Sequence, residues 1–367
     1  MYGTETAYDQ LPNLPIKGRG SISNRVGRFE RQDRVAIDDG WRSLTGETER
    51  PKLRTTLSVD TSKKVITYNQ SPDVPFDRSI NPYRGCEHGC VYCFARPSHA
   101  YWGLSAGLDF ESKLFHKPDA PEILAKELSK KGYKPGPIAL GANTDPYQPV
   151  ERDQQLTRRI LEVLAEFKHP FSIITKSDLV LRDLDIIAPM AKQGLASVAV
   201  SVTTLDRKLA NRLEPRACTP SKRLEAIHEL SKAGVPVTTL VAPITPAIND
   251  HEIEAILQAV TRAGALSAGY VLLRLPREID DLFCEWLDAY APDRKDRVLS
   301  LIEECREGKR YRSFWGKRMT GSGVYADMIK QRFRLARKRL GLDQRHWQLD
   351  CSQFTVPPQV GDQMSLL

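Results

Sequence analysis

The sequence lacks the features of a membrane, secreted or disordered protein. It has no run of about 18 consecutive apolar residues, which a membrane-spanning helix requires. Residues 1–20 contain no basic stretch followed by an apolar run, which a signal peptide requires. Cysteine is scarce, and its odd number, seven, disfavours a disulfide framework. We therefore expect a cytoplasmic globular protein with no membrane segment.

Acidic residues are scarce in one segment of the chain. The whole chain of 367 residues has a net charge of +8 and an ordinary globular composition, with 41% hydrophobic and 27% charged residues. Residues 306–345 alone hold 13 Lys and Arg against 3 Asp and Glu. The rest of the chain is therefore close to neutral, and one segment accounts for the basic character.

The pattern of apolar residues predicts an α/β fold after an extended N-terminal arm, residues 1–75, that contains one or two strands. We expect strands near 78–84, 137–142, 171–176, 196–203, 236–243 and 268–275, and helices near 120–131, 151–168, 183–193, 219–233 and 250–263. Each strand and helix pair takes about 33 residues, the size of a βαβ unit. Strict alternation of this kind favours a parallel sheet, either open or closed into a barrel.

A helical extension is expected after the α/β region. Helical patterns occur near 280–290, 295–306 and 324–340, within a basic extension that spans residues 281–350. Residues 351–367 contain Pro357, Pro358 and Gly361, so we expect a flexible tail there.

Three cysteines directly after the first strand predict a metal centre. Cys86, Cys90 and Cys93 form a C-x3-C-x2-C pattern, and Gly85 and Gly89 allow the chain to fold tightly around a ligand. Three thiolates bind three irons of a 4Fe-4S cluster and leave the fourth iron open. Structural zinc, completed by His88 or His99, and buried cysteines without metal are the alternatives.

The segment from Cys86 to Phe94 resembles the signature of the radical S-adenosylmethionine (SAM) superfamily. The resemblance covers about residues 76–280 and implies a partial (β/α)6 barrel. It also implies a 4Fe-4S cluster on Cys86, Cys90 and Cys93, with SAM bound to the open iron. Reductive cleavage of SAM would then yield a 5'-deoxyadenosyl radical. Active sites of such barrels lie at the C-terminal ends of the strands.

Three further sequence segments resemble spore photoproduct lyase and its relatives, often labelled "DNA repair photolyase". They are residues 141–151, 174–177 and 213–216. The resemblance implies a lyase-like enzyme of DNA repair and places Thr144 and Asp145 at the amino group and ribose of SAM. Side-chain chemistry suggests further SAM contacts for four residues: Tyr92 beside the adenine, Lys176 at the carboxylate, Ser201 beside the sugar, and Arg216 at a carboxylate or phosphate.

Ordinary structural roles remain open for five of these six residues. Asp145 precedes a proline and could form a turn or a helix cap. Lys176 could be a solvated loop lysine, and the Ser201 hydroxyl and the Tyr92 ring could belong to the core.

One position departs from the lyase pattern. Where spore photoproduct lyase has a cysteine that returns a hydrogen atom to the product radical, this sequence has Asn143. Dimer reversal by that mechanism would need another donor, such as Cys218 or Tyr147, and the sequence assigns no catalytic hydrogen donor. The remaining cysteines lack metal-ligand spacing and are expected to pack in the fold: Cys218, Cys284, Cys305 and Cys351.

The basic segment interleaves charge with aromatic residues, as in nucleic-acid-binding proteins. Residues 309–318 and 331–339 would neutralise phosphates and stack on bases, so DNA is the expected partner. We expect an amphipathic helix in the second run, with Met328, Phe333, Leu335 and Leu340 inward; a solvated basic face is the alternative. Basic residues of the arm follow the same pattern more weakly: Lys17, Arg19, Arg25, Arg28, Arg31 and Arg34.

The last five residues resemble the peptide by which bacterial repair proteins dock on the sliding clamp. They are Gln363, Met364, Ser365, Leu366 and Leu367. Such a peptide at a flexible terminus would raise the local concentration of the protein on new DNA. A tail that packs on its own domain is the alternative.

The leading hypothesis is a radical SAM enzyme that acts on nucleic acid, with an electron donor such as flavodoxin or ferredoxin. The first alternative is the same chemistry on RNA, protein or a small molecule. The second is a non-catalytic iron-sulfur or zinc module that binds DNA and the clamp.

Overall fold

The computed structural model describes residues 13–30, 53–343 and 348–358. Its main element is a seven-stranded sheet of order β10-β9-β8-β7-β6-β3-β2, in which six strands are parallel and β2 pairs antiparallel at one end. The strands are β2 (Thr67–Tyr68), β3 (Arg78–Ile80), β6 (Ile138–Leu140), β7 (Phe171–Thr175), β8 (Ala196–Ser201), β9 (Val237–Ile244) and β10 (Ser267–Leu272). The mixed α/β class and the parallel sheet are confirmed.

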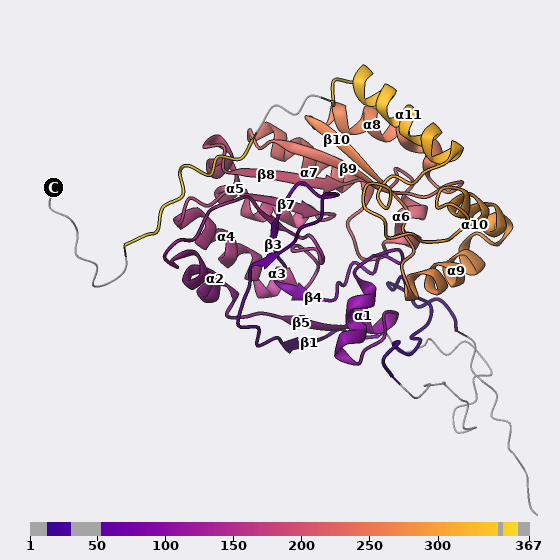
Figure 1. Ribbon diagram of the computed structural model, residues 1–367, viewed down its shortest axis with the longest axis horizontal. Helices are drawn as coiled ribbons and strands as arrows, with labels where there is room; N and C mark the ends of the chain where they lie inside the picture. Colours follow the sequence, from indigo (N-terminus) through magenta and orange to yellow (C-terminus); the bar gives the residue numbers. More distant parts are fainter. Residues whose placement is uncertain (1–12, 31–52, 344–347, 359–367) are drawn as a thin grey trace, which may run out of the picture.

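Helices cover the outer face of this sheet (Figure 1). They are α2 (Ala120–Leu128), α3 (Glu151–Gln154), α4 (Leu156–Glu166), α5 (Leu184–Lys192), α7 (Pro220–Lys232) and α8 (Ile253–Arg262). Apolar side chains at helical spacing pack on the Val and Ile residues of the strands to form the main core. The chain enters the next strand after each helix, which is why the strands run parallel.

The opposite face of the sheet lines the inside of the partial barrel. Strand register places Ala199 opposite Thr238, and Thr238 opposite Ser267, on this face. Ser172 and Ser197 point to the same face of neighbouring strands, because side chains alternate along a strand. These small side chains leave the inner face partly exposed, whereas the alternating Val and Ile side chains are buried under the helices.

A second, smaller sheet of order β1-β5-β4 was not predicted. It joins β1 (Thr56–Val59), β5 (Lys113–His116) and β4 (Tyr83–Arg84), and α1 (Leu108–Ser112) precedes β5. The sequence suggested one strand over 78–84, but Pro82 has no N–H for a ladder and the strand divides into β3 and β4 there. This sheet carries the part of the arm after residue 53 to the side of the cysteine segment.

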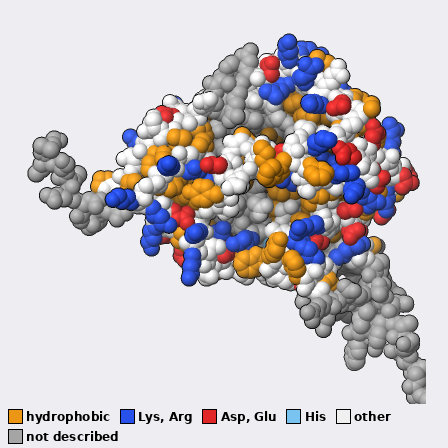
Figure 2. Space-filling model, viewed as in Figure 1, with side chains coloured by type: hydrophobic (Ala, Val, Ile, Leu, Met, Phe, Trp, Pro, Cys, Tyr) orange, Lys and Arg blue, Asp and Glu red, His pale blue; other side chains and the backbone are white. Residues whose placement is uncertain are grey.

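The C-terminal extension has two parts. Helices α9 (Glu278–Tyr290) and α10 (Lys295–Glu304) follow the end of β10, and α6 (Arg207–Leu213) contacts α9 through a hydrogen bond from the Trp286 indole to the Arg212 carbonyl. Helix α11 (Val324–Arg339) packs against α8 on the outside of the barrel, where Phe333 contacts Tyr270. Lys and Arg side chains cover the top of the molecule over α11 (Figure 2).

The buried face of α11 differs from the prediction. Ile329, Phe333 and Ala336 are buried, whereas Met328 and Leu335 are 38% and 54% exposed. The helix faces the barrel with residues at i, i+4 and i+7, so the prediction was right for Phe333 and missed by one position at Met328 and Leu335. An exposed apolar strip therefore runs beside the basic residues of α11.

Part of the predicted tail is anchored. Phe354 packs on Tyr133 and Phe167, and the Thr355 N–H donates to the Phe167 carbonyl. Prolines say nothing about packing, and Phe354 and Thr355 fix this part of the segment to the barrel. Arg31, Arg34 and the clamp-like peptide of residues 363–367 lie outside the described residues. In the described part of the chain, no helix has the length and apolar character to cross a membrane.

A loop of residues 309–319, here named the edge loop, joins the two ends of the sheet. Met319 accepts a hydrogen bond from the Leu272 N–H at the free edge of β10. The Gly316 N–H donates to Asp73 at 2.7 Å, and Arg318 pairs with the same carboxylate. Asp73 lies between β2 and β3, at the other end of the strand order. The edge loop therefore closes the gap that an open six-stranded barrel leaves.

Candidate active site at the cysteine loop

The three cysteines lie on a loop of residues 85–95, here named the cysteine loop, beside the C-terminal ends of the strands. Cys86 and Cys90 are buried and Cys93 is partly exposed, and none of the three forms a disulfide. Gly85 and Gly89 have φ of +75° and +67°, and a Cβ on either would meet atoms closer than 3.0 Å. The loop therefore needs glycine at both positions, as the sequence predicted.

A buried ion pair fixes the cysteine loop from below. The Arg96 guanidinium donates to the Cys90 carbonyl at 2.8 Å and to the Gly89 carbonyl at 3.1 Å, and it pairs with Glu111. Both side chains are fully buried. The Gln148 side chain adds a second support, since it accepts from the Glu87 N–H at 2.8 Å and donates to the Gly85 carbonyl at 3.2 Å.

The N-terminal arm covers the same loop. Glu111 accepts hydrogen bonds from the Gly20 and Ser21 N–H groups at 2.9 and 2.8 Å. A Cβ on Gly20 would lie 1.7 Å from the Gly89 carbonyl oxygen, so the two backbones are in direct contact. The arm is thus part of the wall around the cysteines.

Three of the basic residues of the arm are used in contacts within the fold. Arg19 is buried and donates to the Glu111 carbonyl, Arg25 pairs with Glu285, and Arg28 pairs with Glu278. This part of the sequence interpretation is corrected: these arginines tie the arm to α1 and α9.

The thiols are close enough to influence one another. Burial raises the pKa of the Cys86 thiol, and the charges of Asp145, Cys90 and Cys93 raise it further. Burial also raises the pKa of Cys90 to about 12, although Lys176 acts in the opposite direction. The raised pKa values of the Cys86 and Cys90 thiols fit a bound cation, which would stabilise their thiolates.

Within residues 13–30, 53–343 and 348–358, no three His, Cys, Asp or Glu side chains are grouped as for a single metal ion.

Thr144 and Asp145 hold the cysteine loop to the second and third parallel strands. The Thr144 hydroxyl donates to the Tyr83 carbonyl at 2.9 Å. The Asp145 carboxylate accepts from the Thr175 hydroxyl at 2.7 Å and the Lys176 N–H at 2.8 Å, and it lies 3.3 Å from His88.

Both Asp145 oxygens therefore have protein partners. Burial alone would raise the pKa of Asp145, but the charge of His88 and these hydrogen bonds lower it to about 2. This geometry favours the turn alternative, in which Asp145 positions His88 and Lys176.

Lys176, Tyr92 and Glu214 form a charged cluster beside Cys90. The Lys176 ammonium lies 6.0 Å from the centroid of the Tyr92 ring. Burial would lower the pKa of Lys176, but Cys90 and Glu214 raise it, so the ammonium stays charged. The Tyr92 hydroxyl donates to the buried Glu214 carboxylate, which also pairs with Arg223. Tyr92 is thereby fixed next to two of the cysteines, in the smaller core cluster that includes Cys90.

Ser201 and Arg216 differ in their settings. Ser201 is buried on the inner face at the end of β8, in the same row as Ala199. The Arg216 side chain is about one-third exposed and pairs with Glu87 of the cysteine loop at 2.9 Å. Its backbone N–H donates to the His88 carbonyl at 3.2 Å. The structure thus brings all six predicted SAM-contact residues to this end of the barrel, with Arg216 already paired.

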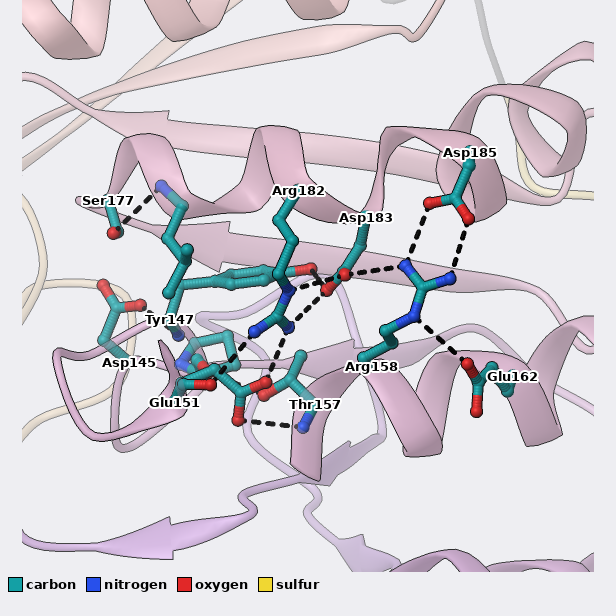
Figure 3. Close-up of polar contacts among 12 residues, drawn as sticks. Asp145, Tyr147, Glu151, Thr157, Arg158, Glu162, Ser177, Arg182, Asp183 and Asp185 are labelled. Atoms are coloured by element: carbon teal, nitrogen blue, oxygen red, sulfur yellow. Dashed lines mark hydrogen bonds and ion pairs between the residues drawn. The ribbon is translucent and has the colours of Figure 1, made fainter. Parts of the chain in front are cut away.

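A second layer of ion pairs supports the segment after Asp145 (Figure 3). Arg182 bridges Glu151 and Asp183 at 2.7 and 2.8 Å, and the Tyr147 hydroxyl donates to Asp183 at 3.0 Å. Tyr147 points into this network, where burial and neighbouring carboxylates raise the pKa of its phenol. It is therefore poorly placed to donate a hydrogen atom to a substrate.

Sequence reasoning missed the residues that support the site. Five residues make the polar contacts around the cysteines: Arg96, Glu111, Gln148, Glu214 and Arg223. Only Gln148 and Glu214 lie within the segments that resemble spore photoproduct lyase. Arg96 and Glu111 meet through tertiary structure, and no local spacing marks them. The one available signal was the concentration of charged residues in otherwise apolar surroundings.

Comparison with known protein families agrees with this geometry. A model of the radical SAM superfamily matches residues 80–260, which contain the cysteine loop and most of the parallel sheet. The chain belongs to the radical SAM superfamily. Members of this superfamily generally use SAM and a 4Fe-4S cluster, so the chain is a radical SAM enzyme by family.

Similar proteins support the same assignment. An uncharacterised protein of Mycobacterium tuberculosis (strain ATCC 25618 / H37Rv) is 33% identical over 290 residues, which are 78% of this chain and 82% of that protein. An uncharacterised protein of Methanocaldococcus jannaschii is 30% identical over 196 residues, 52% of this chain and 68% of that protein. These relatives add no established substrate.

Solved structures of spore photoproduct lyase share the fold. One cysteine-to-serine mutant of the lyase superposes with a TM-score of 0.56 and 18% identity, covering 82% of this chain and 84% of the lyase. The lyase complexed with a dinucleoside spore photoproduct gives 0.54 and 17%, covering 77% and 78%. The partial-barrel architecture and the resemblance to spore photoproduct lyase are thereby confirmed at the level of fold.

Proposed function

We propose that this radical SAM enzyme cleaves SAM reductively and acts on nucleic acid, in DNA repair. The observation that carries the first part is the group of Cys86, Cys90 and Cys93, the first two of them buried, at the strand ends beside the Lys176 ammonium. These cysteines would hold a 4Fe-4S cluster. When bound, the reduced cluster and SAM supply a 5'-deoxyadenosyl radical.

The protein's own groups would bind and orient SAM. The charged Lys176 ammonium is the group suited to a carboxylate, and the Tyr92 ring is fixed for stacking by its bond to Glu214. Ser201 and the small residues of its row leave space on the inner face. Asp145 would act on SAM indirectly, because its oxygens already hold His88 and Lys176.

The edge loop supports a nucleic-acid substrate. Its Phe314 and Trp315 side chains are 60% and 63% exposed, and Lys317 is exposed beside them. Aromatic rings between basic residues suit bases and phosphates of an exposed strand. A base within a duplex would have to leave the stack to reach a buried radical. Spore photoproduct lyase, which shares this fold, has been solved with a dinucleoside bound, which is consistent with this substrate class.

One assay tests the chemistry. Anaerobically reconstituted protein is reduced with dithionite and given SAM, and 5'-deoxyadenosine is measured. We expect 5'-deoxyadenosine from wild type and from Cys351→Ala, and none from Cys90→Ala, because only Cys90 belongs to the cysteine loop. Bound and reduced iron without 5'-deoxyadenosine would contradict the proposal and favour the non-catalytic module.

Two partners belong to the same proposal. A flavodoxin or ferredoxin would supply the electron, and residues 363–367 would dock on the sliding clamp. Deletion of residues 363–367 should abolish clamp pull-down while 5'-deoxyadenosine formation is unchanged. Equal clamp binding by the truncated chain would refute the docking role.

A further inference from the structure

Arg274 occupies an unusual position between the cysteine loop and the edge loop. It follows β10, and its guanidinium carbon lies 5.1 Å from the centroid of the Phe94 ring, next to Cys93 in the sequence. On the other side it donates to the Met319 sulfur at 3.2 Å. Arg274 therefore connects the two loops, and its side chain is only partly buried.

The guanidinium of Arg274 is poorly satisfied. Its Nε is buried and has no hydrogen-bond partner among the described residues. A thioether is a weak acceptor, and the main oxygen group in its surroundings is the phenol of Tyr311, which offers no full negative charge. Burial, which is the largest influence, lowers the pKa of Arg274, and the neighbouring Arg318 lowers it further.

The buried arginines of the described chain have better hydrogen-bond partners than Arg274. Each of them donates to two or more oxygen acceptors: Arg19, Arg78, Arg96, Arg223 and Arg306. A partly buried guanidinium with an unpaired Nε and no ion pair among the described residues costs stability, so its retention beside the cysteine loop suggests a ligand. Arg318 is no substitute, since Asp73 already neutralises it.

We propose that Arg274 binds a phosphate of the nucleic-acid substrate and sets the reacting nucleotide against the Phe94 ring. Phe94 is 47% exposed, so one face of its ring is open to a base or sugar while the guanidinium lies over the ring. A planar guanidinium suits phosphate oxygens, and the edge-loop aromatics extend the stacking surface. This inference rests on the proposed nucleic-acid function.

The test measures binding of a fluorescein-labelled, single-stranded eight-nucleotide DNA to the reconstituted full chain at several salt concentrations. Arg274→Met should weaken binding by about 10-fold or more, the loss of a charge-assisted hydrogen bond. The slope of log affinity against log salt should become shallower by about 0.7, the value of one phosphate on a single strand. Arg334→Met, on α11, removes the same charge and should change affinity by less than about 3-fold.

SAM also contains an oxyanion, its carboxylate, so a second measurement must distinguish it from a phosphate of the nucleic acid. SAM affinity, measured by calorimetry, should be unchanged in Arg274→Met; a matching loss would assign the guanidinium to the SAM carboxylate and overturn the inference. The melting temperature should rise by about 1–3 °C, because a methionine removes an unpaired buried cation. A fall would show a structural role instead.

The outcomes separate the two levels of the proposal. If wild type and Arg274→Met bind DNA with the same affinity and the same salt slope, only the role of Arg274 is overturned. Wild type that binds no oligonucleotide overturns the nucleic-acid function and this inference together.

Discussion

The cysteine loop and the edge loop lie on opposite sides of Arg274 and satisfy their polar groups in different ways. Around the cysteine loop, carbonyls and amides are paired with buried side chains such as Arg96, Gln148 and Glu111. The edge loop instead presents exposed aromatics and is held to the barrel by the bonds of Gly316 and Arg318 to Asp73. One loop has its contacts made within the protein, and the other leaves contacts to be made with a ligand.

This difference indicates where rigidity is needed. A cluster and SAM require ligands in fixed positions, and buried hydrogen-bond networks provide this at the cost of intolerance to change. A nucleic-acid strand varies in sequence, so stacking surfaces and surface charge suit it better. The contrast predicts that mutations in the first loop act on stability and those in the second act on binding.

The largest effect is expected from Arg96→Met. It removes the positive charge that is paired with the buried Glu111 carboxylate and a hydrogen-bond donor to several buried carbonyls, so unfolding free energy should fall by about 3–5 kcal/mol. Urea denaturation measures this, and iron content after reconstitution should fall too. Arg332→Met, which breaks a partly exposed pair with Glu254, should cost less than about 1 kcal/mol. Equal losses in the two variants would remove the contrast between buried and surface pairs.

A smaller effect is expected from Gly20→Ala. The new Cβ would meet the Gly89 carbonyl at 1.7 Å, so the arm must move from the cysteine loop, at about 1–3 kcal/mol. Limited proteolysis should then cut the arm earlier, and iron should be lost faster in air. Gly27→Ala, whose Cβ would be 3.3 Å from its nearest atom, is the control. An unchanged cleavage rate in Gly20→Ala would mean that the arm does not shield the cysteines.

How far the sequence predicted the fold depended on the range of the interactions involved. The six parallel strands are short apolar runs between amphipathic helices, a pattern visible within about 30 residues. Helix 151–168 was predicted as one element but divides at Gln155, whose φ of 47° interrupts it. The cysteine ligand pattern was also local, and so was readable.

The rest of the site depends on pairings across the fold. Glu111 meets Gly20 from 91 residues away, and Asp145 meets His88 across two strands. Asp145 looked like a ligand-binding carboxylate because only its place at a strand end was visible; its partners decide that it positions other groups. Such pairs have no periodicity, so a single sequence does not reveal them.

In the edge loop, the effect should appear in binding alone. Trp315→Ala removes a ring that is 63% exposed, so stability should change by less than about 0.5 kcal/mol. Oligonucleotide affinity should fall by about 5- to 100-fold, the value of one base stacked on an aromatic ring. Leu335→Ala removes a side chain of α11 that is 54% exposed and serves as the control for lost apolar surface. Equal affinity in wild type and Trp315→Ala would exclude this ring as a stacking platform.

The smallest effect is expected from charge reversal on α11, although the pattern of basic and aromatic residues marks that helix and the edge loop equally. Arg334 and Arg339 are exposed on the outside of the barrel, where α11 packs on α8 and Tyr270. Exposed charges act weakly beyond about 8 Å at physiological salt. Replacing both with Glu should therefore lower oligonucleotide affinity by no more than about 3-fold at roughly 0.15 M salt, measured by anisotropy. A loss of about 100-fold would place the strand along α11, and the edge loop would then be a structural closure of the barrel rather than its binding surface.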